Sequence, residues 1–412
     1  MTNARTEKRK PRDLFILQEG LGDAVAFTAL CEPYFRRFGE KVLVAHKCPE
    51  IFEGNPFCEV LPGIHQDSID PGKLELLRAN GFNPVFLTYC DYPFNPTLSC
   101  SEIVYRRRHM IETMGARIGL SGKIASSPRI FLTQEEAKAG RRSEKPQIVL
   151  LAQGKTEWKT VPAAVLRQVC ERLLEDGRFE AIQIGLAGDE LISERVMDLR
   201  GKTTVREAAA ILANSALFIG PLGFNCHLAR AARCRSVVLL PQSEPPELAA
   251  YQGDEAVFSE TQCDLCRKDN LMLRGEQCPN GFACIRTMSA DRVVDAARRL
   301  LGAGPLPAEA DVWDFGNGGE TVRDMSLYEA MRKTLTPRLE LFRAMPDEPF
   351  SEKNLISIPI HPRGAVCECA FRFRDDGSAR RFRLDFNPEP GQAFLIRELD
   401  FLSGGATVQS LK

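Results

Sequence analysis

A short glycine-containing stretch near the start of the chain leads into a carboxylate. Gly20-Leu21-Gly22-Asp23 follows the apolar run 14–17 and precedes a helical stretch at 24–37. Two glycines let the backbone approach a ligand closely, and the dipole and free N–H groups at a helix start stabilise a carboxylate. Asp23 is therefore a candidate general base for a hydroxyl proton. The simpler interpretation is that Asp23 only caps the helix.

Two later tracts carry groups suited to an anionic ligand. Lys159 and Thr160 lie just before Pro162, a residue that suits the first turn of a helix, and Lys159 could neutralise a phosphate. A lysine in a loop is more often only solvated. The second tract runs from Gly220 to His227 as strand, glycine-containing loop and helix, and N–H groups at such a helix start bind anions. A ligand role and a structural role for His227 both stay open.

Four cysteines form a cluster in the second half of the chain. Cys263 and Cys266 have the spacing of a metal knuckle, and Cys278 and Cys284 follow closely. In a reducing compartment, four clustered thiols usually bind a metal with tetrahedral geometry. Four ligands leave no open position, so the site would be structural, with zinc or iron as the metal. Labile disulfides or free thiols are the alternative.

Short apolar runs alternate with helical stretches on either side of these tracts. Strands are predicted at 14–17, 41–45, 84–89, 147–152, 181–185, 216–220 and 236–240, and helices at 24–37, 103–118, 162–175, 205–214 and 226–232. This alternation is typical of parallel α/β layers. The charged stretch 134–146 interrupts it and is predicted to be a linker. The fold class is therefore α/β, with two doubly wound, Rossmann-like domains that face a cleft and bind ligands at the carboxyl ends of their strands.

The chain changes character after this alternation. One helix is predicted at 322–344, and alternating runs at 355–360, 366–374, 382–385 and 393–401 predict a small antiparallel β module. The predicted domains are 1–140, 145–305 with the cysteine insertion at 263–284, and 320–412, a helix with a module that faintly resembles the β-sandwiches appended to bacterial glycosyltransferases.

The composition excludes some classes of protein. The chain has 412 residues, 44% hydrophobic and 26% charged, which is an ordinary globular balance. A net charge of −1 gives no overall basic footprint for nucleic acid. No apolar run approaches the ~20 residues of a membrane-spanning helix, although contact with a membrane surface stays open. The basic, polar N-terminus lacks the apolar core of a signal peptide, so we expect a cytoplasmic protein.

Taken in order and spacing, the three tracts resemble glycosyltransferase family 9, the ADP-heptose:lipopolysaccharide heptosyltransferase family. The similarity runs from about Leu14 to Leu301. The Gly-Leu-Gly-Asp turn matches the start of the family, and Lys-Thr-Val-Pro at 159–162 stands in the place of the family's Lys-x-Trp-Pro. Residues 198–220, DLRGKTTVREAAAILANSALFIG, are close to the family's segment before its nucleotide loop. The resemblance implies the GT-B fold.

The resemblance also implies roles for individual residues. Asp23 would be the general base, Lys159 would hold the donor phosphates, and Asp189 or Glu190 would bind the ribose. The donor site as a whole would comprise Gly20, Gly22, Lys159, Thr160, Asp189, Glu190, Gly220, Gly223, Asn225 and His227. The chain departs from the family in its second-domain loop, where Leu222 replaces an aspartate and Phe224 replaces a glycine. This departure puts the identity of the donor, and activity itself, in question.

The implied function is that of an inverting glycosyltransferase in bacterial surface glycan synthesis or protein glycosylation. Its donor would be a nucleotide-activated sugar, with ADP-heptose as one candidate, and its acceptor a glycan or a protein. A family branch that modifies autotransporter proteins binds iron through a similar cysteine cluster. Two alternatives remain: a non-catalytic scaffold, favoured by Leu222 and the extra β module, and a nucleotide-sugar epimerase, for which no separate acid/base set is visible. The sequence does not give the oligomeric state.

Overall fold

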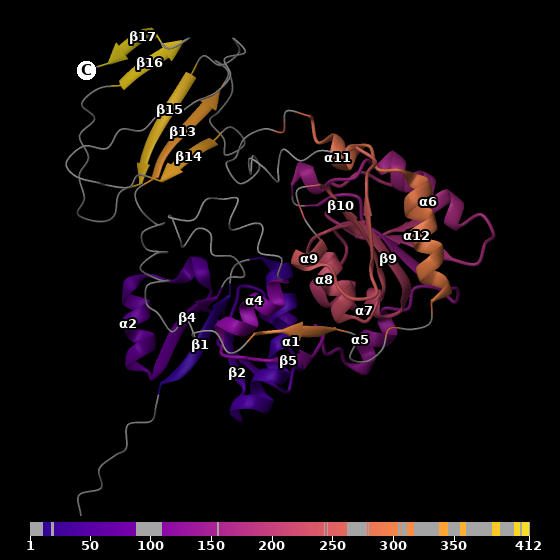
Figure 1. Cartoon of the computed structure of the whole chain (residues 1–412), viewed down its shortest axis with the longest axis horizontal. Coiled ribbons are helices and arrows are strands. Elements are labelled where there is room, and N and C mark those ends of the chain that lie inside the picture. The colour runs from indigo at the N-terminus through magenta and orange to yellow at the C-terminus, as the bar shows by residue number, and fades with distance from the viewer. Residues whose placement is uncertain are drawn as a thin grey trace, which may run out of the picture. The chain divides into compact units, whose positions relative to one another are not determined.

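The computed structural model describes two compact units, Met1–Leu327 and Tyr328–Lys412 (Figure 1). In the first unit it describes residues 11–17, 20–87, 109–154, 156–242, 244, 246–261, 278, 280–303, 306 and 311–316. In the second it describes the strands at 338–344, 355–359, 381–387, 399–403 and 406–411. Among these residues, no helix is both long and apolar enough to span a membrane.

The first sheet has four parallel strands in the order β3-β2-β1-β4. Its strands are β1 (Arg12–Leu17), β2 (Val42–Ala45), β3 (Cys58–Val60) and β4 (Phe82–Leu87), and the helices of this part are α1 (Leu21–Phe38), α2 (Pro71–Ala79) and α4 (Met110–Arg117), with 3₁₀ turns η1 (Pro49–Ile51) and η2 (Gln66–Ser68). The buried strands β1 and β2 are apolar on both faces, as parallel strands covered by helices require. Residues 88–108 lie outside the described residues, and with them the first six residues of the predicted helix 103–118, whose later part contains α4.

The second sheet has six parallel strands in the order β11-β10-β9-β6-β7-β8. Its strands are β6 (Gln147–Leu150), β7 (Glu180–Gln183), β8 (Val196–Asp198), β9 (Ser215–Pro221), β10 (Ser236–Leu240) and β11 (Glu255–Phe258). Its helices are α6 (Ala163–Leu173), α7 (Val205–Ala213), α8 (Phe224–Ala231), α9 (Pro246–Ala249), α11 (Ala283–Arg286) and α12 (Ala290–Gly302), and η3 (Glu157–Lys159) is a 3₁₀ turn. This is the strand order of a doubly wound nucleotide-binding sheet.

Alternate residues along the strands of the second sheet pack into different cores. Ile148 and Leu150 of β6 join the core beneath α6 and α12. Val149 of the same strand joins the core on the opposite face, which also contains residues of α7, α8, α1 and the first sheet. The period of two therefore places helices on both faces. One continuous apolar core joins the two sheets within the first unit.

In each sheet there is one point at which successive strands of the chain begin to be added on the other side. The predicted site residues come directly after the strands that flank this point. In the first sheet the reversal lies between β1 and β4, and α1 begins just after β1. In the second it lies between β6 and β9, and these strands lead into η3 and α8. Open α/β sheets bind ligands outside the carboxyl ends of strands at such points. The topology therefore agrees with the three sequence tracts.

The stretch 134–146, predicted to be a linker, begins with an ordered helix. The helix α5 (Gln134–Ala139) packs against α7. Thr133 caps it by accepting the N–H of Glu136, whose side chain accepts the N–H of Thr133 in return. This reciprocal capping stabilises a helix start within the stretch. The chain later returns to the first half, where β12 (Val312–Asp314) pairs antiparallel with β5 (Lys123–Ala125).

The second unit contains strands where a helix was expected. The single helix predicted at 322–344 is wrong at its end, because β13 (Arg338–Ala344) is a strand between β14 (Leu355–Pro359) and β15 (Arg381–Asn387), antiparallel to both. Residues 322–337 lie outside the described residues. A separate antiparallel pair is formed by β16 (Leu399–Ser403) and β17 (Ala406–Leu411).

Candidate functional site

The glycine-containing turn after β1 opens directly into α1. Gly20 is the N-cap residue of α1 and has no side chain with which to cap the helix. Asp23 lies in the first helical turn, and a Cβ atom on Gly20 would lie 2.5 Å from its Oδ2 atom. The carboxylate therefore folds back over Gly20, at the positive end of the helix dipole. A side chain at position 20 would displace it.

The start of α1 meets the start of α8 through a second glycine. A Cβ atom on Gly22 would lie 2.8 Å from Cδ2 and 3.4 Å from Nε2 of His227. His227 lies in α8, which begins after the N-cap residue Gly223 and packs against α1. The backbones of the first and third sequence tracts thus approach closely only because position 22 has no side chain. The N-terminal ends of the two helices lie together at this junction.

His227 is buried and electrically neutral. It is 4% exposed, and its Nδ1 atom lies 2.7 Å from the hydroxyl of Tyr251. Burial, with the positive charge of Lys159, lowers the pKa of His227 to about 3. Removing a charged imidazole from water is unfavourable, so the neutral form dominates at physiological pH. His227 can therefore donate or accept a hydrogen bond here without carrying charge.

A second buried histidine adds to the buried cluster of His227 and Tyr251 on the side of the first sheet. His109, the N-cap residue of α4, accepts the N–H of Ile111 through Nδ1. Its ring stacks on Trp313 of β12 at 4.3 Å and lies 5.2 Å from the ring of Tyr251. Burial, and then the neighbouring His227, lower the pKa of His109 to about 3. The cluster thus contains residues from three separate parts of the chain.

Lys159 lies at the end of η3, after the carboxyl end of β6. Its carbonyl accepts the N–H of Gly154 at 3.1 Å, and a Cβ on Gly154 would lie 2.5 Å from its Cβ. Its Nζ atom lies 2.6 Å from Oε1 of Glu244, and both side chains are mostly buried. The hydroxyl of Thr160 donates to the Thr156 carbonyl at 3.0 Å. The phosphate-binding candidate therefore already has an anionic partner.

The two carboxylates predicted to bind ribose lie at the end of β7 in different settings. Oδ2 of Asp189 accepts the N–H of Leu186 at 2.8 Å and packs where a Cβ on Gly185 would be, so it closes its own loop. Glu190 is exposed, and its N–H donates to Oε1 of Gln153 at 2.9 Å. Gln153 precedes Gly154, which packs on Lys159. The structure therefore brings Glu190 to the Lys159 loop, whereas Asp189 accepts a hydrogen bond within its own loop.

The unusual loop before α8 is explained by packing. Leu222 is 3% exposed and belongs to the core between the sheets. Gly220 lies within β9, where a Cβ would meet Phe218 at 2.6 Å and Leu151 at 3.1 Å. Phe224 and Asn225 are half-buried in the first turn of α8. Leu222 therefore stabilises the turn from β9 into α8 by packing into the core. Because its side chain is apolar, the polar groups of this position are those of the backbone.

Two of the four clustered cysteines lie among the described residues. Cys278 is half-buried, and its Sγ accepts the N–H of Phe282 at 3.3 Å at the start of α11. Cys284 is buried within that helix. Cys263 and Cys266 lie outside the described residues, and among the described ones no three acidic, histidine or cysteine side chains are grouped to hold a metal. An N–H bond to sulfur suits a thiolate ligand, so Cys278 fits the expected metal.

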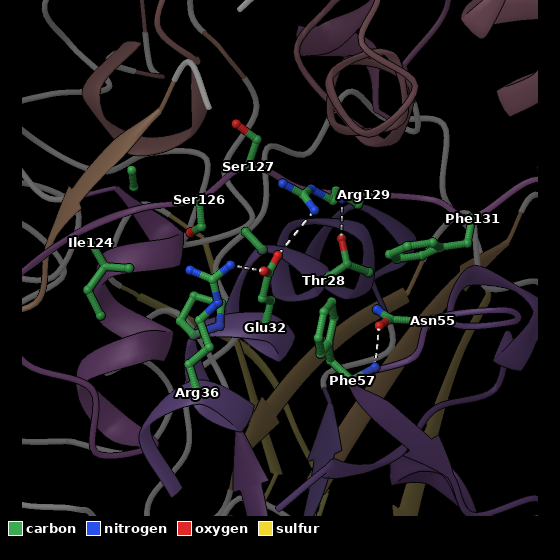
Figure 2. A pocket seen from close by; sticks show the side chains of 13 residues that line it. Thr28, Glu32, Arg36, Asn55, Phe57, Ile124, Ser126, Ser127, Arg129 and Phe131 are labelled. Atoms are coloured by element: carbon green, nitrogen blue, oxygen red, sulfur yellow. Dashed lines mark hydrogen bonds and ion pairs between the residues drawn. The ribbon is translucent and has the colours of Figure 1, made fainter. Parts of the chain in front are cut away.

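A pocket beside α1 is lined by none of the predicted site residues (Figure 2). Glu32 lies at its centre and pairs with Arg129 at 3.1 Å and with Arg36 at 2.5 Å. The hydroxyl of Thr28 accepts the N–H of Arg129 at 2.9 Å. The charges of this pocket thus satisfy one another, which indicates a structural role.

Sequence analysis missed Glu244, Tyr251 and His109. None of them lies in a motif, and their partners lie far away in the chain: Lys159 for Glu244, His227 for Tyr251 and Trp313 for His109. A histidine followed three residues later by Glu112 was the one available signal. The side chain of Glu112 accepts the N–H of His109 and completes a capping box.

The comparisons with known proteins concern mainly the fold. Neither a known family model nor a curated protein matches the sequence. Among solved structures, a glycosyl transferase family 9 protein from Veillonella parvula matches with a TM-score of 0.52 and 13% identity, over 71% of this chain and 97% of that one. The ADP-heptose LPS heptosyltransferase II of E. coli matches with a TM-score of 0.52 and 15% identity, over 70% and 98%.

A third solved structure is the iron-containing dodecameric glycosyltransferase TibC from enterotoxigenic E. coli. It matches with a TM-score of 0.52 and 16% identity, over 71% of this chain and 76% of its own. At these identities the likeness establishes the fold. The α/β chain with parallel sheets described above therefore has the fold of the family 9 glycosyltransferases, as the three sequence tracts predict.

Proposed function

We propose that the chain is an inverting glycosyltransferase that moves a sugar from a nucleoside diphosphate to a hydroxyl of a glycan or protein. The observation that carries this proposal is the contact between Gly22 and His227. It brings the α1 start, with Asp23, against the α8 start, at the strand-order reversals of both sheets. One junction thus combines a carboxylate with a helix N-terminus, a feature that can bind anions.

The second sheet supplies groups for the donor. Lys159 and the N–H groups at the start of α8 would bind the diphosphate. Glu190 is the exposed carboxylate near the Lys159 loop and would bind the ribose hydroxyls. The solved heptosyltransferases make ADP-heptose the first donor to test.

The first sheet supplies the base. Asp23 would take the proton of the acceptor hydroxyl as its oxygen forms a bond to the anomeric carbon. The bond from that carbon to the diphosphate breaks, and the diphosphate leaves with the electron pair. Attack from the face opposite the leaving group inverts the anomeric centre. Lys159 and the α8 amides would stabilise the charge that develops on the diphosphate.

The four cysteines would hold a structural zinc or iron ion outside this chemistry. In the sequence, Cys278 and Cys284 lie between β11 and α12, and Cys284 is part of α11. When bound, the metal would hold together the chain between β11 and α11. TibC, one of the similar structures, is iron-containing.

Asp23→Asn is the decisive variant. We expect the rate of sugar transfer to fall by about 10²–10⁴-fold, because the amide cannot accept the proton. Binding of ADP, measured by calorimetry, should stay within a few fold. Asp291→Asn, on the exposed start of α12, is the matched control and should keep full activity. Unchanged transfer by the Asp23 variant would overturn the role of base.

A second candidate is a non-catalytic binding protein, which the Lys159–Glu244 ion pair favours. A buried carboxylate on the phosphate-binding lysine opposes a second anion. If the folded wild-type chain binds no nucleoside diphosphate and transfers no sugar, this second function is supported. If it binds a nucleotide-sugar donor and transfers the sugar, the second function is wrong.

A further inference from the structure

We propose that Tyr251 is a positioning residue that holds His227 as the Nε2–H tautomer, with this N–H directed at the turn that carries Asp23. The consequence for sugar transfer rests on the proposed function. The tautomer itself rests only on the hydrogen bonds and packing around His227.

The hydrogen bond to Tyr251 determines which nitrogen carries the proton. The Tyr251 hydroxyl lies 2.7 Å from Nδ1 of His227, and both side chains are 4% exposed. If Nδ1–H donated, the buried phenolic proton would need another acceptor, and no such bond occurs among the described residues. An unsatisfied buried donor costs about 1–3 kcal/mol. The phenol therefore donates to Nδ1, and the proton of His227 resides on Nε2.

The opposite edge of the imidazole faces the start of α1. A Cβ on Gly22 would lie 2.8 Å from Cδ2 and 3.4 Å from Nε2. The N–H on Nε2 is thus carried next to the helical turn that contains Asp23. Two contacts set the direction of the Nε2–H bond. The hydroxyl of Tyr251 holds the imidazole at Nδ1, and Gly22 packs against the opposite edge of the ring.

Buried contacts also fix the ring of Tyr251. The guanidinium of Arg230, one turn after His227 on α8, lies 5.5 Å from the ring centre. Arg230 is itself held by Asp311 through two bonds of 2.8 and 2.6 Å, and these two side chains are 2% and 0% exposed. If Tyr251 turned away from His227, its ring would lose this contact with a guanidinium that is itself held in place.

The charge states agree with this arrangement. Burial raises the pKa of Tyr251, so the phenol keeps its proton. Burial lowers the pKa of His227 to about 3, so the imidazole stays neutral. At this junction, Lys159 would supply the positive charge and His227 a neutral, directed N–H. The group that such a donor recognises is an anionic oxygen, and the leaving diphosphate is the one that the proposed reaction provides.

Histidine NMR tests the tautomer directly on the full chain. The Nε2–H and Nδ1–H forms differ in their ¹⁵N and ¹³Cδ2 chemical shifts, and the His227 signal is identified by its loss in His227→Gln. We expect Nε2–H in the wild type and a mixture of tautomers in Tyr251→Phe. Tyr34→Phe, which removes a phenol hydroxyl from α1, should leave the signal unchanged. An Nδ1–H wild type, or a Tyr251→Phe variant identical to it, would overturn the proposal.

Kinetics test the consequence. Tyr251→Phe keeps the ring over Arg230 and should lower kcat about tenfold, equivalent to ~1.4 kcal/mol, with little change in KM for ADP-heptose. A structural role would instead lower the melting temperature without changing the tautomer, which the NMR spectrum detects. If the wild type transfers no sugar, the proposed function fails, and the spectrum still decides whether Tyr251 sets the tautomer.

Discussion

Gly22 shows how a single absent side chain shapes the candidate site. A Cβ at this position would come within 2.8 Å of the His227 ring, closer than real Cβ atoms approach. His227 would have to move, and with it the start of α8. The glycine therefore sets the spacing between base and donor site. This requirement differs from the ligand-approach role that the sequence suggests for the same residue.

Glu244→Gln should strengthen binding of nucleoside diphosphates. The carboxylate lies 2.6 Å from Nζ of Lys159, with side-chain exposures of 17% and 24%. A diphosphate must displace this carboxylate or tolerate its negative charge. Removing the charge while keeping the shape should lower the Kd for ADP about 3–10-fold, because one opposing partly buried charge is lost.

Isothermal titration calorimetry with ADP measures this change. Glu247→Gln removes the same charge from an exposed position of α9 and is the matched control, with an expected Kd within twofold of the wild type. Lys159→Met should weaken binding in either background. If Glu244→Gln weakens binding instead, Glu244 is part of the donor site and does not compete with the phosphates.

Among the secondary-structure elements, local signals predicted most helices and strands, and the structure differs from the prediction in two segments. The charged stretch 134–146 begins with α5, which a capping box starts and packing on α7 retains. Residues 338–344 read as the end of a helix, yet form the central strand of a three-stranded sheet. The capping box of α5 is a local signal, because Thr133 and Glu136 are three residues apart in the chain. For residues 338–344 the pairing with two distant strands decided the outcome, because helix and strand preferences differ by less than such pairing contributes.

The chain around α11 should contain one bound metal ion. We expect about one zinc or iron per chain by plasma mass spectrometry of the purified protein, as a four-thiolate site predicts. Cys278→Ser and Cys284→Ser should each remove most of the metal and lower the melting temperature. Cys170→Ala, a buried cysteine of α6 outside the cluster, should keep the metal. Metal-free wild-type protein with free thiols would contradict this prediction.

At the scale of the whole first unit, Arg206 ties the two sheets together. This α7 side chain is 8% exposed and bonds both carboxylate oxygens of Glu136, at 2.5 and 2.6 Å. It also donates to the carbonyls of Phe131 at 2.7 Å and of Glu50, in η1, at 3.0 Å. One guanidinium thus joins α7 of the second sheet to α5 and to the first half of the chain.

Arg206→Met should lower the free energy of unfolding by about 2 kcal/mol, because carbonyls and a carboxylate lose their donor. Urea titration followed by circular dichroism measures the loss. Arg299→Met, which breaks an exposed ion pair with Glu255, should cost about 0–1 kcal/mol. Equal losses in the two variants would show that Arg206 does not join the sheets.

The same contact gives the stability a pH dependence. The Arg206 guanidinium and the N–H of Thr133 lower the pKa of Glu136 to about 2. Because the pKa is lower in the folded state, the stabilisation is complete above the unfolded value near 4.5 and is lost as the pH falls towards 2. In Arg206→Met this acid-dependent part should be smaller.

The amino-acid sequence alone was enough to predict the alternation of strands and helices, the parallel α/β class and the three tracts at the ends of strands. These features are local, since hydrophobic period, glycine position and caps are set by neighbours in the chain. Asp23, Lys159 and His227 could therefore be named before any contact was known.

The tertiary structure decided what those residues touch. It paired Lys159 with Glu244, used Asp189 inside its own loop, packed Leu222 into the core, and set Tyr251 on His227. Each of these contacts joins atoms whose distance depends on how strands order and helices pack. Burial, which neutralises His227, likewise exists only once the core has formed.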